Sequence, residues 1–542
     1  MHAASNTGND TREGYQIGAA PTLPRAWSRQ GDKTAGPNNQ LLGARRRRAI
    51  LGPMRRLGAM RFAVLVFASG AFAACGTFLA LDDFEVVERE VGSDAGSDAG
   101  SDTCWLPDGS GHGNPCFACS GGLQPELLNA CTTRGSFWFD DRGRISGYDA
   151  GRPPLPEGGV EEPPVADATP GTASVLCKNL PGKPVYVVGS TALGADSKSV
   201  MAKFSAALAA TGAARIVYQK QTSCRGFDIM VNGEPLTGTA KSWDASGAET
   251  ECSFDKDEHA DIGLSDVGGG ECHKDFAGLP PDIEAFSGPV QVFMFITHKD
   301  SSQEVISYEA AHRVYGWGGT IGPAPWTVPK NILKRSRTSG TQIVIGRSID
   351  LDAEDWRGVP IASSGGVLDA LVPLTPPDST LAITSADVAD VFENRQNCKL
   401  LAYQHAGQYL GFLPDTDRGS WDKRNVRDGH YALWEPLHIF ARKGGAKATE
   451  ITATRNLLRG VTVPEKLEYI PALKVGGLVP PCAMRVDRDS TTDKLIPYRS
   501  DVPCHCAFEK ALPSSPIACS SCAAGEKCPE GTSCRRGLCE AP

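Results

Sequence analysis

The clearest alternation of apolar and polar positions runs from about residue 176 to residue 475. Short apolar runs that end at Gly, Ser or charged residues predict buried strands in this block. These runs are PVYVVGS (Pro184–Ser190), ARIVYQ (Ala214–Gln219), ADIGLSD (Ala260–Asp266), VQVFMFITH (Val290–His298) and TQIVIGRSI (Thr341–Ile349). Alternation of such runs with amphipathic stretches predicts an α/β fold with parallel pairing, in which ligands gather at the carboxyl ends of strands.

The stretch DSKSVMAKFSAALAATG, between the first two runs, predicts an amphipathic helix. Its apolar stripe consists of Val200, Met201, Phe204 and Leu208. We expect Asp196 or Ser197 to cap the start of this helix and Gly212 to end it.

The segment before this block has the pattern of an exported lipoprotein. Basic residues precede an eleven-residue apolar run, Phe62–Phe72, which is too short to span a bilayer and suits a signal peptide. The small residues before Cys75 resemble a bacterial lipobox, which implies cleavage before Cys75 and lipidation of its sulfur. We therefore expect residues 54–75 to be the signal and residues 1–53 to fall outside the mature protein. A plain signal peptide or a membrane anchor is the alternative.

Composition divides the remaining chain further. The repeat GSDAGSDAGSD within residues 76–103 has no large apolar side chain and predicts a flexible tether. Residues 104–175 carry cysteines and a Pro-rich linker, and residues 476–542 form a cysteine-rich tail that we expect to depend on its disulfides. The net charge of −8 gives no electrostatic reason to expect a nucleic-acid partner.

Seventeen cysteines follow Cys75 and fall into three even groups, with Cys398 left alone between the last two. Even groups in an exported chain predict disulfides, although their connectivity stays open. The CFAC (Cys116–Cys119) and CSSC (Cys519–Cys522) motifs leave zinc binding as an alternative, but scarce histidine disfavours it and we expect no metal or cofactor.

Four polar loops lie next to ends of the predicted strands. The last one, KRSRTSGT at 334–341, combines positive charge with hydroxyls and glycine backbone. A polar surface turn is the simpler interpretation, whereas an oxyanion site is the alternative that the other loops favour. Candidate ligand-binding residues in the four loops are Ser190, Thr191, Ser223, Asp266, Arg335, Ser339, Gly340 and Thr341. We expect Lys334 and Arg337 to face solvent.

These motifs, in order, resemble the substrate-binding subunit of the bacterial phosphate ABC transporter, a class II periplasmic binding protein. The resemblance spans about 300 residues and rests on VVGSTAL, YQKQTS, DIGLSD and the ungapped Arg-x-x-x-Ser-Gly-Thr of Arg335–Thr341. It implies a two-lobed α/β fold with mixed sheets over 176–475, with lobe I at 182–288 and 430–475 and lobe II at 289–429. Disulfide-rich terminal segments would flank the lobes.

The resemblance implies that these loops bind inorganic phosphate or a related oxyanion in the cleft between the lobes. Arg335 can pair with two oxygens at once, and the start of a helix or turn at Ser339 can offer N–H groups. Asp266 would repel a fully ionised anion but can accept the proton of hydrogen phosphate, so it favours phosphate over sulfate.

The chain departs from the family pattern at several places. Ala192 and Leu193 stand where a ligand-binding pair is common, and Cys224 and Arg225 follow Ser223. A bridge from Cys224 to Cys252 or Cys272 would fix the second loop, while Arg225 would contact ligand or face water.

We expect a binding protein without enzymatic activity, located in the periplasm or cell envelope and lipid-anchored to the inner or outer membrane. An ABC permease is the expected partner, with scavenging or sensing as other uses of the same binding. The alternative function is a cell-surface interaction protein with a degenerate cleft. A phosphoryl-cleaving hydrolase would need a metal cluster that the sequence does not show.

Overall fold

The computed structural model describes residues 105–107, 115–117, 127–130, 136–138, 144–145, 152–157 and most of 173–541, with gaps at 195, 391, 489, 492, 513–518 and 524–525. All of them belong to one compact unit, Leu81–Pro542. The predicted signal, Cys75 and the tether lie outside the described residues, as does most of the first cysteine group. None of the described helices is long and apolar enough to cross a bilayer.

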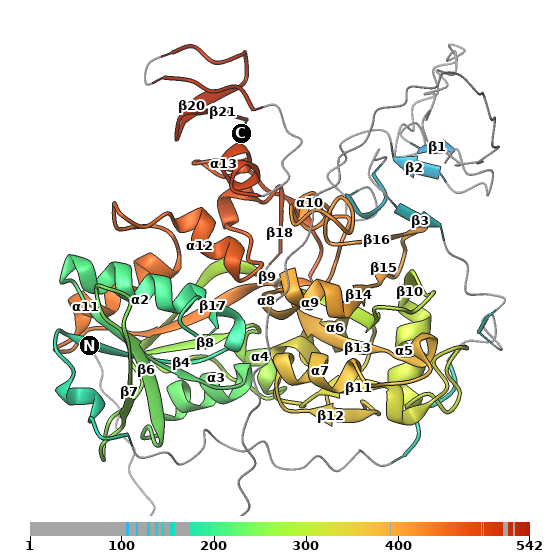
Figure 1. The fold of residues 1–542 in the computed structure, drawn as a ribbon, viewed down its shortest axis with the longest axis horizontal. Coiled ribbons are helices and arrows are strands. Elements are labelled where there is room, and N and C mark those ends of the chain that lie inside the picture. Colours follow the sequence, from blue (N-terminus) through green and yellow to red (C-terminus); the bar gives the residue numbers. More distant parts are fainter. Residues whose placement is uncertain are drawn as a thin grey trace, which may run out of the picture. The chain divides into compact units, whose positions relative to one another are not determined.

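A large mixed sheet organises the described residues (Figure 1). Its strands run in the order β13 (Ala382–Ser385), β9 (Ile283–His298), β17 (Trp434–Arg442), β8 (Ile262–Ser265), β4 (Pro184–Gly189), β5 (Arg215–Lys220), β6 (Thr239–Trp243) and β7 (Glu249–Ser253), with β14 (Cys398–Leu400) also on β9. Strand β4 pairs in parallel with β5 and β8, as the sequence predicts, whereas β17 is antiparallel to β8 and β9.

Helices complete the α/β pattern. The α-helices are α2 (Val200–Thr211), α3 (Ser223–Asn232), α4 (Gly269–Cys272), α5 (Tyr308–Trp317), α6 (Gly340–Ser348), α7 (Ser364–Leu371), α8 (Ala386–Ala389), α9 (Phe392–Asn397), α10 (Arg424–Arg427), α11 (Ala448–Leu458), α12 (Tyr469–Val475) and α13 (His505–Lys510). The 3₁₀ helices are η3 (Cys177–Asn179), η4 (Thr191–Leu193), η5 (Pro329–Asn331), η6 (Pro377–Ser379) and η7 (Pro481–Ala483).

Smaller sheets surround the main one. One consists of β10 (Val305–Ser307), β15 (Ala402–Gln404), β16 (Leu410–Phe412) and β3 (Ser136–Trp138). The two-stranded ones are β1 (Trp105–Pro107) with β2 (Pro115–Phe117), β11 (Leu333–Arg335) with β12 (Val359–Ile361), β18 (Val486–Asp487) with β19 (Ile496–Pro497), and β20 (Ser533–Arg535) with β21 (Leu538–Glu540).

Alternate side chains of β4 enter two different hydrophobic cores. Val185 and Val187 pack with residues of α2, α11 and α12, while Tyr186 and Val188 pack with residues of α3 on the other face. Because both faces of the sheet are covered, β4 is a continuous apolar run rather than an alternating one.

A third core fills the other half of the fold, around α5, α6 and β13. Two strands, β9 and β17, run through both halves. Among the strands, the first part of β9 pairs with β17, and its last residues pair with β13 and β14. The pairing of β9 with β17 shifts register at Pro436–His438. These two strands therefore join the halves, in the way that hinge strands join lobes (Figure 1).

Two local predictions need correction. Helix α2 starts at Val200, and Ser199 is its cap, accepting the Ala202 N–H at 3.2 Å. Asp196 instead accepts the Lys198 N–H within the preceding turn, at 2.8 Å. Gly212 ends the helix in the left-handed conformation, as predicted.

The apolar run Thr341–Ile349, predicted among the strands, is helical and forms most of α6. Six consecutive residues from Thr341 are buried, so the helix has no polar face that would have revealed its period in the sequence.

The C-terminal segment also differs from its prediction. Val479, Met484 and Phe508 are buried in the same core as β9 and β13, and Val479 exchanges backbone hydrogen bonds with Val290. The part of the tail up to about residue 512 is therefore held by ordinary packing as well as by the Cys482–Cys504 disulfide, and it does not depend on disulfides alone.

The disulfides of the second and third cysteine groups follow the predicted grouping. They join Cys177 to Cys252, Cys224 to Cys272, Cys482 to Cys504, Cys506 to Cys519, Cys522 to Cys534, and Cys528 to Cys539. Cys398 is a free, buried thiol, as its isolated position predicts. The CSSC motif is oxidised, which excludes a zinc site there in this state; Cys119 of the CFAC motif lies outside the described residues.

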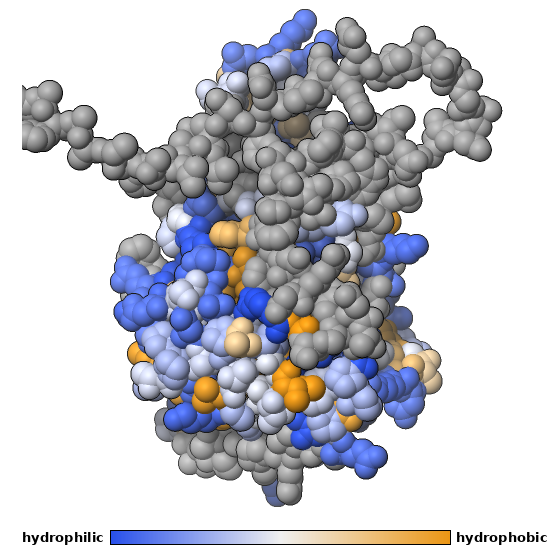
Figure 2. Space-filling model, turned by 90° about the vertical axis from the view of Figure 1, so that its right-hand side faces the viewer, coloured by the Kyte–Doolittle hydropathy of each residue, from blue (hydrophilic) through white to orange (hydrophobic). Residues whose placement is uncertain are grey.

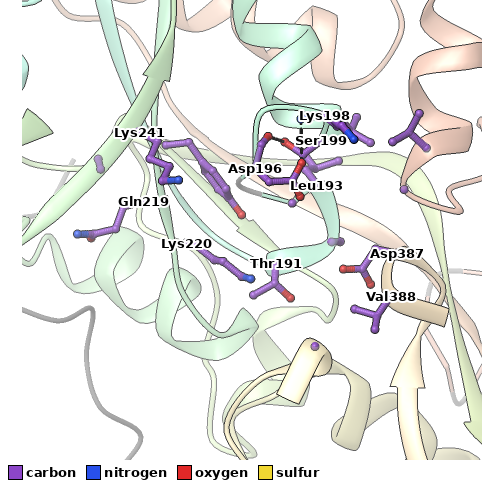
Figure 3. A pocket seen from close by; sticks show the side chains of 18 of the residues that line it. Thr191, Leu193, Asp196, Lys198, Ser199, Gln219, Lys220, Lys241, Asp387 and Val388 are labelled. Atoms are coloured by element: carbon purple, nitrogen blue, oxygen red, sulfur yellow. Dashed lines mark hydrogen bonds between the residues drawn. The ribbon is translucent and has the colours of Figure 1, made fainter. Parts of the chain in front are cut away.

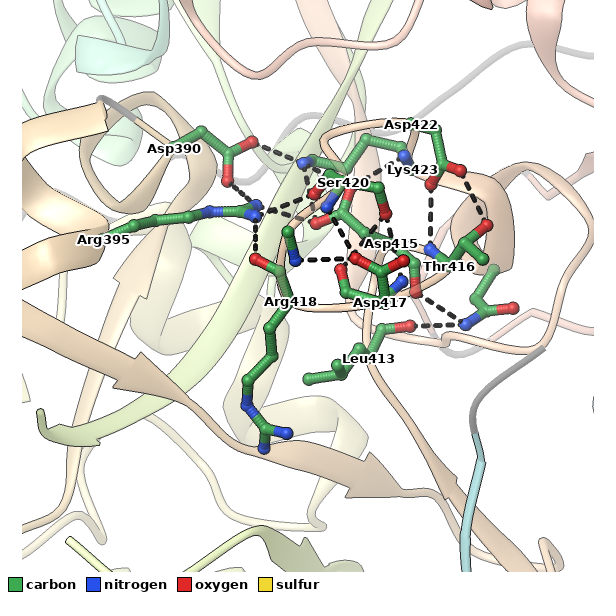
Figure 4. Close-up of polar contacts among 12 residues, drawn as sticks. Asp390, Arg395, Leu413, Asp415, Thr416, Asp417, Arg418, Ser420, Asp422 and Lys423 are labelled. Atoms are coloured by element: carbon green, nitrogen blue, oxygen red, sulfur yellow. Dashed lines mark hydrogen bonds and ion pairs between the residues drawn. The ribbon is translucent and has the colours of Figure 1, made fainter. Parts of the chain in front are cut away.

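A buried ionic network fixes the loop before α10 (Figure 4). Asp390 and Asp415 each pair with both Arg395 and Lys423, and all four side chains are at most 8% exposed. Two carboxylates and two cations make the network neutral, which offsets part of the cost of burying the charges.

Candidate functional site

The carboxyl ends of the predicted strands converge on one carboxylate, Asp266, which follows β8 directly. The Ser190 hydroxyl, after β4, donates to Asp266 Oδ1. The Ser223 hydroxyl, at the start of α3, donates to Asp266 Oδ2 at 3.0 Å. Because β4, β5 and β8 run in parallel, these three loops share one edge of the sheet.

The start of α6 packs directly against this carboxylate. A Cβ atom at Gly340 would lie 2.6 Å from the Asp266 Cβ and 2.6 Å from the Ser223 hydroxyl, so this position requires glycine. The Thr338 carbonyl also accepts the Cys224 N–H at 3.3 Å. The fourth loop, from the second half of the fold, therefore contacts two loops of the first half.

Arg335 ends β11 and is 3% exposed. Its guanidinium donates to the carbonyls of Ile361 and Ala362, both at 3.1 Å, and to the Ser364 hydroxyl. Burial lowers the Arg335 pKa to about 10, against the opposing effect of nearby Asp387 and Asp266. Arg335 thus remains positively charged at neutral pH and lies within electrostatic range of both carboxylates.

The other predicted residues surround this group. Ser339 precedes α6 and its hydroxyl caps none of the helix N–H groups; Ser339 and Thr341 are buried. Thr191 is half-buried and lines the adjacent pocket. Lys334, predicted to face solvent, is 1% exposed because its β-strand is covered, while Arg337 is exposed as predicted.

The second loop is anchored covalently. Of the two bridges considered for Cys224, the structure has the one to Cys272, which ties the start of α3 to α4. Arg225 forms an ion pair with Glu234 at 2.6 Å, on a part-exposed surface of α3. Arg225 therefore does not join the residues around Asp266.

Two polar residues near Asp266 were missed by the sequence analysis. The Tyr218 hydroxyl donates to the Ser190 carbonyl and so holds the first loop. Asp387, in α8, accepts a hydrogen bond from Ser385. Burial and the nearby Asp266 raise the pKa of Asp387 to about 6, although the positive charges of Lys220 and Arg335 act to lower it. Asp387 follows an apolar strand, β13, which is the one signal that could have identified it.

A pocket of about 780 Å³ lies beside these residues. Its walls come from η4, α2, β5, β6, β7 and the end of α12 in the first half, and from α7 and α8 in the second. Figure 3 shows the Lys220 and Asp387 side chains on either side of Thr191. The pocket thus lies between the halves, and Thr191 is the one predicted residue among those lining it.

The raised pKa of Asp387 predicts a pH-dependent cost to folding. A carboxyl whose folded pKa lies above its unfolded value destabilises the fold when ionised, and the penalty grows as pH rises from about 4 to about 6. We expect Asp387→Asn to raise the free energy of unfolding at pH 7.5 by at most about 3 kcal/mol, since pocket solvent screens the charge. Urea unfolding at pH 7.5 and pH 4 measures this gain, which should disappear at the lower pH; an equal gain at both pH values would contradict it.

No protein-family model and no curated protein sequence matches the chain. Similar solved structures include a putative phosphate ABC transporter substrate-binding protein with bound phosphate from Clostridium perfringens, at 14% identity over 55% of this chain and 99% of that one, with a TM-score of 0.38. An ABC-type phosphate transport receptor from Vibrio cholerae matches at 13% identity over 55% and 100% of the two chains, with a TM-score of 0.34.

A mutant OxyR from Corynebacterium glutamicum is also similar, at 9% identity over 54% of this chain and 66% of that one, with a TM-score of 0.31. These identities and TM-scores assign neither a family nor a ligand to this chain.

Proposed function

We propose that this protein binds phosphate, or a similar protonated oxyanion, outside the cytoplasm, between the two halves of its fold. The observation that carries this proposal is the meeting of Ser190, Ser223 and Gly340 on Asp266, with the Arg335 charge close by. These residues come from four separate segments, and burial shifts the pKa values of both Asp266 and Arg335, as is common for charged groups at binding sites.

The hydrogen-bond donors of this group of residues suit an anion, and the one acceptor, Asp266, suits an anion that carries a proton. Arg335 supplies positive charge, and the start of α6, a helix of nine residues, lies against Asp266, so its first N–H groups would be available to an anion held there. On binding, the two serine hydroxyls would rotate away from Asp266 and donate to the anion instead. The Asp266 carboxylate would then accept a hydrogen bond from the O–H group of the protonated ligand. Sulfate has no proton to give, so it would leave Asp266 repelled and unpaired.

The mature protein would be a binding protein and not an enzyme. The six disulfides among the described residues fit an oxidising compartment. Lipidation at Cys75 would hold it at the inner or outer membrane. Closure around the hinge strands β9 and β17 would present the loaded form to an ABC permease, or serve scavenging or sensing.

A calorimetric screen of phosphate, arsenate, sulfate and molybdate tests the proposal with the wild type and Asp266→Asn. We expect the wild type to prefer phosphate over sulfate by about 10⁴-fold, because a buried unpaired acceptor is so costly. The asparagine side chain of the variant offers an N–H₂ donor, so the variant should bind the two anions within about tenfold of each other.

The same screen should show a pH effect. Burial raises the pKa of Asp266, although the hydrogen bonds from Ser190 and Ser223 and the Arg335 charge act to lower it. As pH falls, protonated Asp266 becomes a donor, so wild-type sulfate affinity should increase while that of Asp266→Asn changes less. Equal wild-type affinity for phosphate and sulfate at pH 7.5 would contradict the role given to Asp266.

One observation favours the alternative function, an interaction protein with a degenerate cleft. Every nitrogen of the Arg335 guanidinium already donates to the protein, and both Asp266 oxygens accept serine hydroxyls.

The described residues visible in Figure 2 are mostly hydrophilic with separate hydrophobic spots, so that view supplies no broad apolar docking surface. Absence of any oxyanion binding in the calorimetric screen would favour this alternative.

A further inference from the structure

Three ionisable side chains converge at a second place, where α4 meets β17. They are Glu271, Glu435 and His438. One carboxylate oxygen from each glutamate and one ring nitrogen of the histidine lie within 4.8 Å of one another. Glu435 is fully buried, and the Glu271 side chain is 8% exposed.

Each carboxylate is anchored through one oxygen and bare at the other. Glu271 Oε2 accepts the Gly268 N–H at 2.7 Å, and Glu435 Oε2 accepts the Thr491 hydroxyl at 2.6 Å. Among the described residues, neither Oε1 atom has a hydrogen-bond donor, and His438 Nε2 has no hydrogen-bond partner either. Such anchoring is how proteins orient carboxylates toward a metal.

The nearby arginines do not complete the cluster. Arg347 Nε is 3.8 Å from Glu271 Oε1, and Arg488 Nε is 4.0 Å from Glu435 Oε2, both too far for hydrogen bonds. His438 Nε2 lies 3.5 Å from Glu435 Oε1, close enough for both atoms to bind one ion. Orphaned buried carboxylate oxygens are costly, and a shared cation would satisfy them.

We propose that Glu271, Glu435 and His438 bind a divalent transition-metal ion, such as Zn²⁺ or Mn²⁺. Two carboxylates and one imidazole are a ligand set suited to these ions, and water would complete the coordination. Two arginines compete with a cation here. Arg347 is 31% exposed at its side chain and can turn toward solvent. Arg488 is buried, but it lies beside the anchored Oε2 of Glu435 and donates to the carbonyls of Ala432 and Thr491, so it leaves Oε1 open.

The site is distinct from the proposed oxyanion site but adjoins it. His438 lies opposite Ser265 in the sheet, one residue before Asp266. Glu435 and His438 also flank the register shift in β17, where the two halves are joined. A metal here would stabilise the hinge region, and its binding does not depend on whether the protein binds phosphate.

The test uses the full-length protein after dialysis against a chelator. Zn²⁺ or Mn²⁺ is added, unbound metal is removed by gel filtration, and bound metal and the melting temperature are measured. We expect about one equivalent of bound metal and a higher melting temperature in the wild type. Glu435→Gln and His438→Gln should each weaken binding by more than tenfold, and Thr491→Val, which removes the anchor of Glu435, by about tenfold.

Arg347→Gln separates a metal site from a purely structural charge cluster. Removal of this competing cation should tighten metal binding several-fold, whereas in a charge cluster it would only destabilise the fold. Glu284→Gln, at an exposed glutamate on β9, is the matched control and should bind metal like the wild type. Wild-type protein that retains no metal and shows no melting shift overturns the proposal, as does equal binding by Glu435→Gln, His438→Gln and wild type.

Discussion

Replacing Arg335 with glutamine is expected to weaken phosphate binding by about 10²- to 10³-fold. Loss of one member of a buried, hydrogen-bonded charge pair costs about 2–5 kcal/mol, and each 1.4 kcal/mol is about tenfold in affinity. The variant would also remove one of the positive charges that offset Asp266 and Asp387, although Lys220 would remain near Asp387. Both carboxylates would then repel a dianion more strongly.

Arg337→Gln is the matched control for this variant. Arg337 belongs to the same loop but is exposed, so its replacement should change phosphate affinity by less than about threefold at moderate salt. Calorimetric titration measures both affinities, and near-UV circular dichroism checks that Arg335→Gln is folded. A folded Arg335→Gln protein that binds phosphate within threefold of the wild type would exclude Arg335 from the site.

The convergence of loops on Asp266 could be predicted because it depends on local pattern. Buried runs such as Pro184–Ser190 predict strands, parallel strands share an edge, and polar residues just after them must meet there. Asp387 was missed because α8 brings it to the site from the second half of the fold, more than a hundred residues after Asp266. No short-range pattern encodes that approach.

The α6 error has a different physical cause. In TQIVIGRSI, the polar residues Thr341, Gln342 and Ser348 are buried together with the apolar ones, so polarity does not mark an exposed face that would distinguish a period of 3.6 from a period of 2. The sequence also does not reveal the cluster of Glu271, Glu435 and His438. These residues are far apart in the chain, and the pairing of β17 with β8 brings them together. Position in the fold, and not residue type, makes them a candidate site.

Lys423→Met is expected to lower the free energy of unfolding by about 3–5 kcal/mol, because it leaves buried carboxylates unpaired. Lys423 Nζ is 2.9 Å from Asp415 Oδ1 and also pairs with Asp390 (Figure 4). Burial alone would raise the pKa of Asp415, but Lys423 and Arg395 hold this pKa below its usual value. This stabilisation is present above the unfolded pKa and is lost as pH falls, so the cost of the substitution should shrink in acid.

Lys274→Met provides the contrast, because Lys274 forms an ion pair with Asp352 at the surface. The Lys274 side chain is 73% exposed and the Asp352 side chain is 60% exposed. Its loss should cost at most about 1 kcal/mol. Urea unfolding followed by tryptophan fluorescence measures both, at pH 7.5 and pH 4. Adding Asp415→Asn to Lys423→Met should recover part of the loss, because the double variant has one fewer buried negative charge. If Lys423→Met costs no more than Lys274→Met, the network in Figure 4 does not stabilise the loop before α10.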